Sequence, residues 1–297
     1  MNTKKIIKLI LGLFFLFVLI CGGFYVYKSV KSDTSHHYNN KKVTFVALGD
    51  SLTQGVGDTN NQGGYVGRIK NKLIKYDNAK VSVRNYGIAG QRSDQINERL
   101  LNNTDKLATN VKHANSIFLS AGGNDLLQTL QKNALVNDKD KFSISMNKSL
   151  NQYKNNLNSL IQHLRQVNKK SPIYIFSVYN PVYVYFPNVH AISEYVDKYN
   201  SVTSEIVNKQ KKMHFVNIND LSYGQYKTES QRDKLAKDNN NDIDPLSIAK
   251  LYDDKSELND YLSTKDHFHP NNLGYDFMTD KLFNSMQKYN DWYYIGS

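Results

Sequence analysis

Cysteine is nearly absent from this chain of 297 residues, in which Cys21 is the only one. A single cysteine excludes an intramolecular disulfide bond, so the fold cannot depend on such a bond. An extracytoplasmic protein without disulfides and a cytosolic protein are both compatible with this cysteine usage. The cysteine count therefore leaves the cellular compartment open.

Long uncharged apolar stretches are also scarce, and the one present covers residues 9–27, directly after three lysines. At a rise of about 1.5 Å per residue, a helix of this length nearly spans a bilayer core of roughly 30 Å. We therefore expect an N-terminal transmembrane helix over residues 1–28 and a polar linker over residues 29–41. The remaining residues, 42–297, suit one large domain.

A cleavage signal behind the apolar stretch is missing. No A-x-A-like site follows it, and Ile20 stands before Cys21, where a lipobox has a small residue. These absences favour an uncleaved anchor, with a cleaved signal peptide as the alternative. Lysines flank both ends of the stretch and weakly favour a cytoplasmic N-terminus. The sequence thus predicts a single-pass protein of the cell membrane with its large domain extracytoplasmic, or a secreted protein if the segment is cleaved.

The sequence also lacks a continuous basic stripe, although it has 38 basic and 27 acidic residues and a formal net charge of +11. Its lysines are scattered and do not alternate with aromatic residues along one segment, which argues against a nucleic-acid-binding surface. A basic domain beside a membrane is attracted to anionic lipids or anionic wall polymers. Simple solubility is the competing explanation of the same charge.

Sequence patterns for metal binding are weak. Residues 238–244 alternate Asp and Asn in a way similar to a calcium loop, but Ile243 stands where an EF-hand needs Gly. The adjacent His36 and His37 lie in the polar linker without other ligands nearby. We therefore expect no metal site at either place.

Five short apolar stretches, rich in β-branched and aromatic residues, have the pattern of buried strands. They cover residues 43–48, 80–86, 116–120, 172–178 and 214–218. Polar stretches of helical length lie between them, among them residues 65–74 and 146–168. Alternation of short buried strands with helices predicts an α/β fold in which helices enclose a parallel sheet.

Three of these expected strands end in polar or glycine-rich clusters, namely Gly49-Asp50-Ser51, residues 87–90 and Gly122-Gly123-Asn124. In open parallel sheets, ligands bind outside the carboxyl ends of the strands. We therefore expect the three clusters to converge on one crevice. Ser51 is a candidate nucleophile there, and its competing role is that of a cap for the following helix.

A candidate base lies near the end of the chain, where Asp266 precedes His269 by three residues. This spacing allows the carboxylate to hold the imidazole at Nδ1. His267 is the rival base, but its position next to Asp266 makes it less suited to point the same way. Pro270 fits the first turn of a closing helix.

Donors for a developing oxyanion are available at three positions. The Ser51 N–H lies at an expected helix start, and Gly90 has no side chain to hinder its N–H. Asn124 offers a side-chain amide just after a Gly-Gly turn. Taken singly, Gly90 fits a tight turn and Asn124 a helix cap equally well. Their order along the chain with a serine and a histidine favours a common site.

These motifs resemble those of the SGNH hydrolase superfamily, also called GDSL esterases and lipases. The matching blocks are Gly49-Asp50-Ser51-Leu52, Asn85-Tyr86-Gly87-Ile88-Ala89-Gly90, Gly122-Gly123-Asn124-Asp125 and Asp266-His267-Phe268-His269-Pro270. Within the superfamily the chain looks most similar to the YpmR-like bacterial group. The resemblance implies a three-layer α/β/α sandwich with a five-stranded parallel sheet.

The same resemblance implies a serine esterase or lipase with Ser51 as nucleophile, His269 as base and Asp266 as its orienting acid. It assigns the oxyanion hole to the Ser51 and Gly90 N–H groups and the Asn124 amide, and it requires no metal or cofactor. The implied substrate is a small acyl ester, a lipid or an acetylated glycan. A non-catalytic module that binds a wall polymer or lipid, and a thioesterase or acyltransferase, are the alternatives. Oligomeric state does not follow from the sequence.

An aromatic cluster follows the fourth expected strand. It comprises Tyr179, Tyr183, Tyr185 and Phe186. Such residues line an acyl or sugar pocket in some proteins and pack into the core in others. Both interpretations remain open at the level of sequence.

Overall fold

The computed structural model describes residues 42–77, 79–133, 136–239 and 257–293. The predicted transmembrane helix and the polar linker, residues 1–41 together, lie outside the described residues. Within the part of the chain that is described, no helix is both long and apolar enough to cross a membrane.

The five described strands form one parallel sheet in the order β2-β1-β3-β4-β5. Their bounds are Lys42–Gly49 (β1), Lys80–Gly87 (β2), Ser116–Ser120 (β3), Ile173–Phe176 (β4) and Met213–Val216 (β5). Each strand overlaps one apolar stretch of the sequence, so the expected five-stranded parallel sheet is confirmed. Gly49 is in register with Gly87 of β2 and with Ser120 of β3. The segments that follow these three strands therefore meet at one edge of the sheet.

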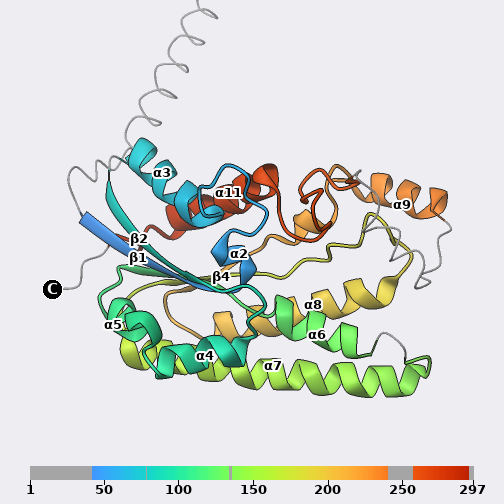
Figure 1. Ribbon diagram of the computed structural model, residues 1–297, viewed down its shortest axis with the longest axis horizontal. Helices are drawn as coiled ribbons and strands as arrows, with labels where there is room; N and C mark the ends of the chain where they lie inside the picture. The colour runs from blue at the N-terminus through green and yellow to red at the C-terminus, as the bar shows by residue number, and fades with distance from the viewer. Residues whose placement is uncertain (1–41, 78, 134–135, 240–256, 294–297) are drawn as a thin grey trace, which may run out of the picture.

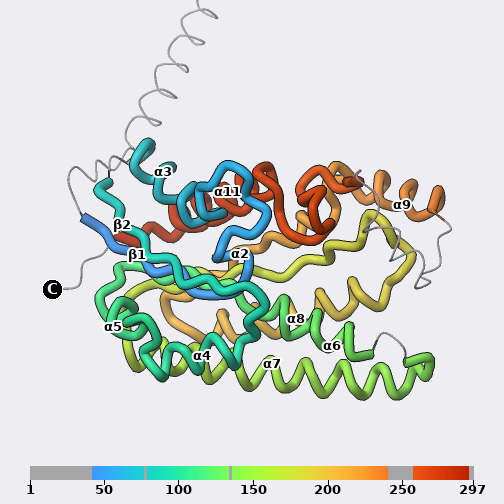
Figure 2. Tube along the Cα trace, viewed as in Figure 1, coloured from blue at the N-terminus to red at the C-terminus, as the bar shows by residue number. Residues whose placement is uncertain are grey.

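Helices cover both faces of the sheet, which gives three layers (Figure 1). The helices α3 (Tyr65–Asp77) and α11 (Asn272–Tyr289) pack on one face. The other face is covered by α4 (Ser93–Leu101), α5 (Leu107–Lys112), α6 (Gly123–Lys132), α7 (Lys139–Val167) and α8 (His190–Asn208). The remaining helical segments are α2 (Ser51–Gln54), η1 (Thr104–Lys106), η2 (Asn219–Ser222) and α9 (Glu229–Asp238). In Figure 2 the last helix, α11, lies beside α3, although the two are far apart in sequence.

Side chains of β1 alternate between the two hydrophobic cores. Phe45 and Ala47 belong to the core under α3 and α11, whereas Val46 and Leu48 belong to the core under α4, α7 and α8. All four are fully buried, and each large side chain contributes about 1.5–3 kcal/mol through its removal from water. The central strand is apolar on both faces for this reason.

The closing helix α11 begins later than the sequence pattern suggested. Asn271 is its N-cap, and the side-chain oxygen of Asn271 accepts a hydrogen bond from the Gly274 N–H at 3.0 Å. Pro270, assigned to the first turn by the pattern, precedes the cap and pairs with Leu262 in an isolated antiparallel bridge. The Asn271 side chain satisfies an otherwise unpaired N–H of the first turn, which places the helix start at this residue.

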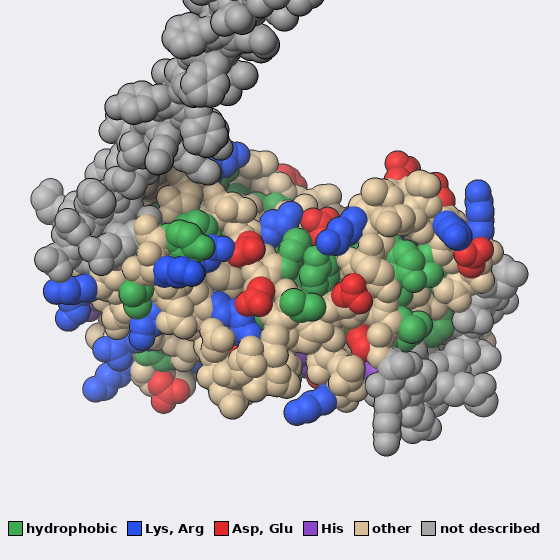
Figure 3. Space-filling view, turned by 90° about the horizontal axis from the view of Figure 1, so that it is seen from above, with side chains coloured by type: hydrophobic (Ala, Val, Ile, Leu, Met, Phe, Trp, Pro, Cys, Tyr) green, Lys and Arg blue, Asp and Glu red, His purple; other side chains and the backbone are tan. Residues whose placement is uncertain are grey.

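The outer face of α3 and α11 carries both signs of charge. Figure 3 shows Lys and Arg side chains interspersed with Asp and Glu on the described part of this face. Two ion pairs there join Lys72 with Asp280 and Lys281 with Asp220. This face therefore offers no continuous basic stripe among the described residues, in line with the scattered lysines of the sequence.

A buried ion pair fixes the loop between α2 and α3. Arg68 lies 2.9 Å from Asp58, and both side chains are almost completely buried. Burial opposes ionisation of Asp58, but hydrogen bonds from Arg68 and from the Gly64 N–H outweigh it, so the pKa of Asp58 is lowered. Arg68 also donates to Asp276 and Asn272 of α11. One guanidinium therefore joins this loop to the closing helix.

Loss of Arg68 would leave the Asp58 carboxylate buried without its cation. We expect Arg68→Met to lower the free energy of unfolding by about 3–5 kcal/mol, measured by urea denaturation. Lys72→Met on the same helix is the matched control, because its partner Asp280 is largely exposed, and we expect a loss below about 1 kcal/mol. Because the folded pKa of Asp58 is lowered, its stabilisation is present above pH ~4 and declines as the pH falls through the folded value. Equal losses in the two variants would contradict this role.

Candidate active site

The turn after β1 is fixed by Asp50. Asp50 is the N-cap of α2, and its carboxylate accepts hydrogen bonds from the Leu52 N–H at 3.0 Å and from the Ser120 hydroxyl at 2.7 Å. Burial raises the pKa of Asp50 above its ordinary value. Because Asp50 occupies the cap position, Ser51 is not the cap of this helix, and its hydroxyl is available for another partner.

That partner is His269, from the loop before α11. The His269 Nε2 atom lies 2.9 Å from the Ser51 Oγ atom, and the His269 Nδ1 atom lies 2.8 Å from a carboxylate oxygen of Asp266. With Nδ1–H donating to Asp266, Nε2 accepts the hydrogen bond of the Ser51 hydroxyl. The structure thus brings together three of the residues selected from the sequence.

Asp266 is held in its ionised form. Burial opposes its ionisation, but hydrogen bonds from the His269 side chain, the His269 N–H and the Phe268 N–H outweigh this effect and lower the pKa of Asp266. An ionised carboxylate at this position fixes the tautomer and the ring orientation of His269.

The loop that carries His269 is braced from two sides. Tyr179 donates its hydroxyl hydrogen to the Phe268 carbonyl at 2.7 Å. Gly57, from the loop after α2, has a left-handed φ of +92°, and a Cβ atom there would collide with the Pro270 carbonyl. Only glycine combines this backbone conformation with so close an approach. The serine and histidine segments therefore pack directly against each other.

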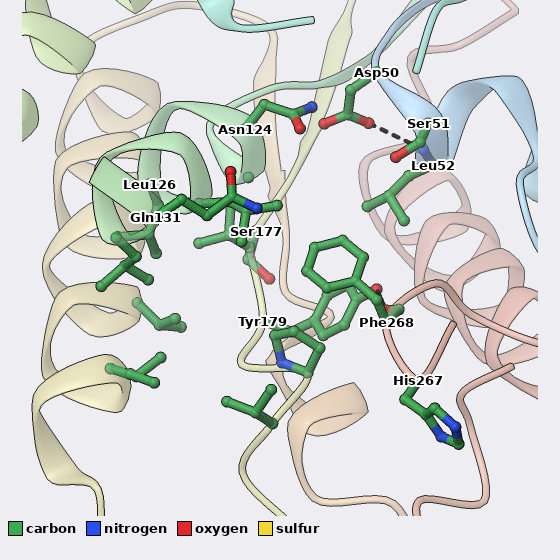
Figure 4. Close-up of a pocket in the computed structure, with 18 of the residues that line it drawn as sticks. Asp50, Ser51, Leu52, Asn124, Leu126, Gln131, Ser177, Tyr179, His267 and Phe268 are labelled. Carbon is green, nitrogen blue, oxygen red and sulfur yellow. Dashed lines mark hydrogen bonds between the residues drawn. The ribbon is translucent and has the colours of Figure 1, made fainter. Parts of the chain in front are cut away.

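His267 points away from Ser51 (Figure 4). Its backbone is left-handed, with a φ of 53°, and its Nδ1 atom lies 2.6 Å from Glu257. Tyr185 donates its hydroxyl hydrogen to the same carboxylate at 2.6 Å. The rival base is therefore engaged in a separate buried pair. Sequence reasoning did not find Glu257, because it lies in a polar segment without a recognisable motif.

The three expected oxyanion donors differ in their hydrogen bonds. Neither the Ser51 N–H nor the Gly90 N–H donates to another described residue. Asn124 lines the same cavity as Ser51, and its amide donates one hydrogen bond to the Gln91 carbonyl at 3.0 Å. Gln128 of α6 in turn donates to the Gly90 carbonyl at 3.0 Å. These bonds tie the loop after β2 to the start of α6.

A large cavity opens from Ser51 and Asn124 along α6 (Figure 4). Its volume is about 460 Å³. Two members of the aromatic cluster, Tyr179 and Phe186, line it. Tyr183 instead packs edge-on against Tyr223, and Tyr185 binds Glu257. The cluster therefore divides between the cavity wall and structural packing.

Comparison with known proteins identifies the family of this chain. Residues 47–277 match the GDSL-like Lipase/Acylhydrolase family. The chain belongs to this family. It is 27% identical over 262 residues to the protein YpmR of Bacillus subtilis, covering 88% of this chain and 86% of YpmR. It is also 25% identical over 242 residues to the spore germination lipase LipC of Bacillus licheniformis, covering 80% of this chain and 93% of LipC.

Solved structures show the same fold. The lipase Lip_vut3 from a goat rumen metagenome superposes with a TM-score of 0.61 at 22% identity, covering 82% of this chain and 97% of the lipase. The acetylxylan esterase Axe2 of Geobacillus stearothermophilus gives a TM-score of 0.52 at 16% identity, covering 84% of this chain and 96% of Axe2. As a member of the GDSL family, the protein is a carboxylic ester hydrolase.

The separate roles of the two histidines can be tested. We expect His267→Ala to lower the free energy of unfolding by about 1–3 kcal/mol, because it removes one partner of the buried Glu257 carboxylate, which keeps the Tyr185 hydroxyl and the Asn259 N–H. Its esterase activity should stay within about tenfold of wild type at a temperature where it remains folded. Urea denaturation and hydrolysis of p-nitrophenyl butyrate give the two readouts. Lys265→Ala, at an exposed position of the same loop, is the control for both. A stable but inactive His267→Ala would contradict this assignment.

Proposed function

We propose that the protein hydrolyses carboxylic esters through a Ser51 nucleophile, with His269 as general base and Asp266 as the residue that orients it. The observation that carries this proposal is the continuous hydrogen-bonded chain Ser51 Oγ, His269 Nε2, His269 Nδ1 and Asp266, with links of 2.9 and 2.8 Å. A serine, an imidazole and a carboxylate in this order are the parts required for acyl transfer to a hydroxyl group.

The geometry supports the following sequence of steps. His269 Nε2 takes the Ser51 proton as Oγ attacks the ester carbonyl, and Asp266 stabilises the resulting imidazolium. The tetrahedral intermediate then expels the alcohol, which receives the proton from His269. A water molecule, activated by the same nitrogen, attacks the acyl-enzyme and releases the acid.

Charge on the carbonyl oxygen needs donors placed before the reaction begins. We assign this role to the N–H groups of Ser51 and Gly90 and to the Asn124 amide. Both N–H groups lack an acceptor among the described residues. An amide has two hydrogens, and the bond of Asn124 to the Gln91 carbonyl uses one and leaves the other.

We also propose that the enzyme is a single-pass membrane protein with an extracytoplasmic catalytic domain. This proposal rests on the apolar stretch over residues 9–27 and the lysines that precede it. Its substrate is an acyl ester, with a lipid or an acetylated glycan as the candidate classes. Lipases and an acetylxylan esterase are both found among the similar proteins.

Removal of the nucleophile or the base tests the mechanism. We expect Ser51→Ala and His269→Ala to lower kcat/KM for p-nitrophenyl butyrate by at least about 10⁴-fold, with little change in thermal stability. The full-length purified chain serves for all variants. Mass spectrometry with an added alcohol acceptor separates hydrolysis from acyl transfer. Undiminished activity of Ser51→Ala would refute the proposed nucleophile.

The oxyanion role of Asn124 makes a quantitative prediction. We expect Asn124→Ala to lower kcat by about 10²–10³-fold with KM nearly unchanged, because the donor acts mainly on the transition state. Steady-state kinetics on the same ester measure both constants. Gln128→Ala, which removes the bond to the Gly90 carbonyl and the bond from Arg92 but no proposed oxyanion donor, should cost far less. A rise in KM at constant kcat would instead assign Asn124 to substrate binding.

A further inference from the structure

The apolar wall of the cavity beside Ser51 comes mainly from three helices and the segment that precedes α8. The helix α6 contributes Leu126, Leu127 and Leu130, and α8 contributes Ile192 and Val196. The first turn of α7 contributes Phe142, which packs against Tyr195 at 6.1 Å between ring centroids. The segment between β4 and α8 completes the lining with Tyr179, Val182, Phe186 and Val189. Apart from Asp50, Asp266 and His267, no ionisable group other than tyrosine is among its described lining residues.

The few polar groups of the lining beyond the Ser51 end already have partners or face solvent. The Ser177 hydroxyl accepts a hydrogen bond from the Ile218 N–H at 2.8 Å. The Asn133 amide donates to the Thr129 carbonyl at 2.7 Å. Gln131 lies at an exposed position. The interior therefore offers hydrocarbon contacts and few free hydrogen-bonding groups for a sugar ring.

The size of the cavity exceeds the needs of an acetyl group. A cavity of about 150 Å³ holds a benzene molecule, so this one, of about 460 Å³, has room for an acyl chain of roughly eight to sixteen carbons. An acetyl group would leave most of this apolar space in contact with water. A longer chain would bury its methylenes there and gain affinity with each one.

We propose that this cavity is an acyl-chain chamber, and that the enzyme prefers esters of medium- and long-chain fatty acids to acetyl esters. This inference rests on the proposed function, because it places the ester carbonyl at Ser51. Asn124 lies at the start of α6, and Leu130 lies six residues further along the helix, about 9 Å away at 1.5 Å per residue. Leu130 therefore lies along the path of the acyl chain, with Asn133 and Val136 lining the cavity further along the sequence, and its size affects the chain length that fits.

A series of p-nitrophenyl esters from acetate to palmitate tests the preference. The full-length chain is assayed in a nonionic detergent, with each ester below its critical micelle concentration. We expect kcat/KM to rise by about two- to fourfold per methylene and to reach its maximum between about eight and fourteen carbons. The best ester should exceed the acetate by at least about 100-fold. A maximum at acetate would overturn the inference.

Two substitutions at Leu130 test its position. Leu130→Trp should lower the ratio of laurate to acetate kcat/KM by at least about tenfold, because the larger indole takes up space that the longer acyl chain needs. Leu130→Ala should move the maximum to longer chains. Lys132→Trp, at an exposed position of the same helix outside the cavity lining, should change neither. Equal loss on all esters in Leu130→Trp, together with an unshifted maximum in Leu130→Ala, would remove Leu130 from the chamber.

The Ser51→Ala variant distinguishes a failure of the proposed function from a failure of the acyl-chain chamber. If it hydrolyses the whole series at the wild-type rate, the proposed nucleophile is wrong. If hydrolysis requires Ser51 but is fastest with acetate, the proposed function stands and only the acyl-chain chamber fails.

Discussion

The buried carboxylate of Asp50 joins the end of β1 to the end of β3. It accepts hydrogen bonds from the Leu52 N–H and from the Ser120 hydroxyl, while the Thr53 hydroxyl lies 2.7 Å from the same Ser120 oxygen. A buried polar group without a hydrogen-bond partner destabilises the fold, so these bonds hold the turn in one conformation. Ser51 lies within this turn, and its position relative to the rest of the site follows from it.

The second constraint brings the two ends of the domain together. His269 is 218 residues from Ser51, on the loop before α11. Arg68 connects Asp58, just after the serine segment, with Asn272 and Asp276 of α11. Tyr275 donates its hydroxyl hydrogen to the Val56 carbonyl at 2.7 Å. These contacts hold the loop that carries His269 against the turn that carries Ser51. The hydrogen bond between the two side chains is therefore supported by packing on both sides.

The residues proposed for catalysis and the cavity proposed to bind the acyl chain lie in different parts of this fold. The residues proposed for ester cleavage lie at the carboxyl edge of the sheet, where the register of β1, β2 and β3 aligns their ends. The cavity lies beyond that edge, between α6, α8 and the segment after β4. Changes to the helices can therefore alter the size of the cavity without moving the sheet that positions Ser51.

The sequence by itself determined the five strands, because short apolar stretches with both faces buried have a distinctive pattern. It also selected Ser51, Asp266 and His269, since blocks of local sequence surround each of them. Only the tertiary structure shows that His269 and not His267 contacts Ser51, because the orientation of His267 depends on its left-handed backbone and on Glu257, which no motif marks. The cavity was equally invisible in the sequence. Its walls come from segments far apart in the chain. Leucines on an amphipathic helix have the same sequence pattern whether they pack into a core or line a cavity.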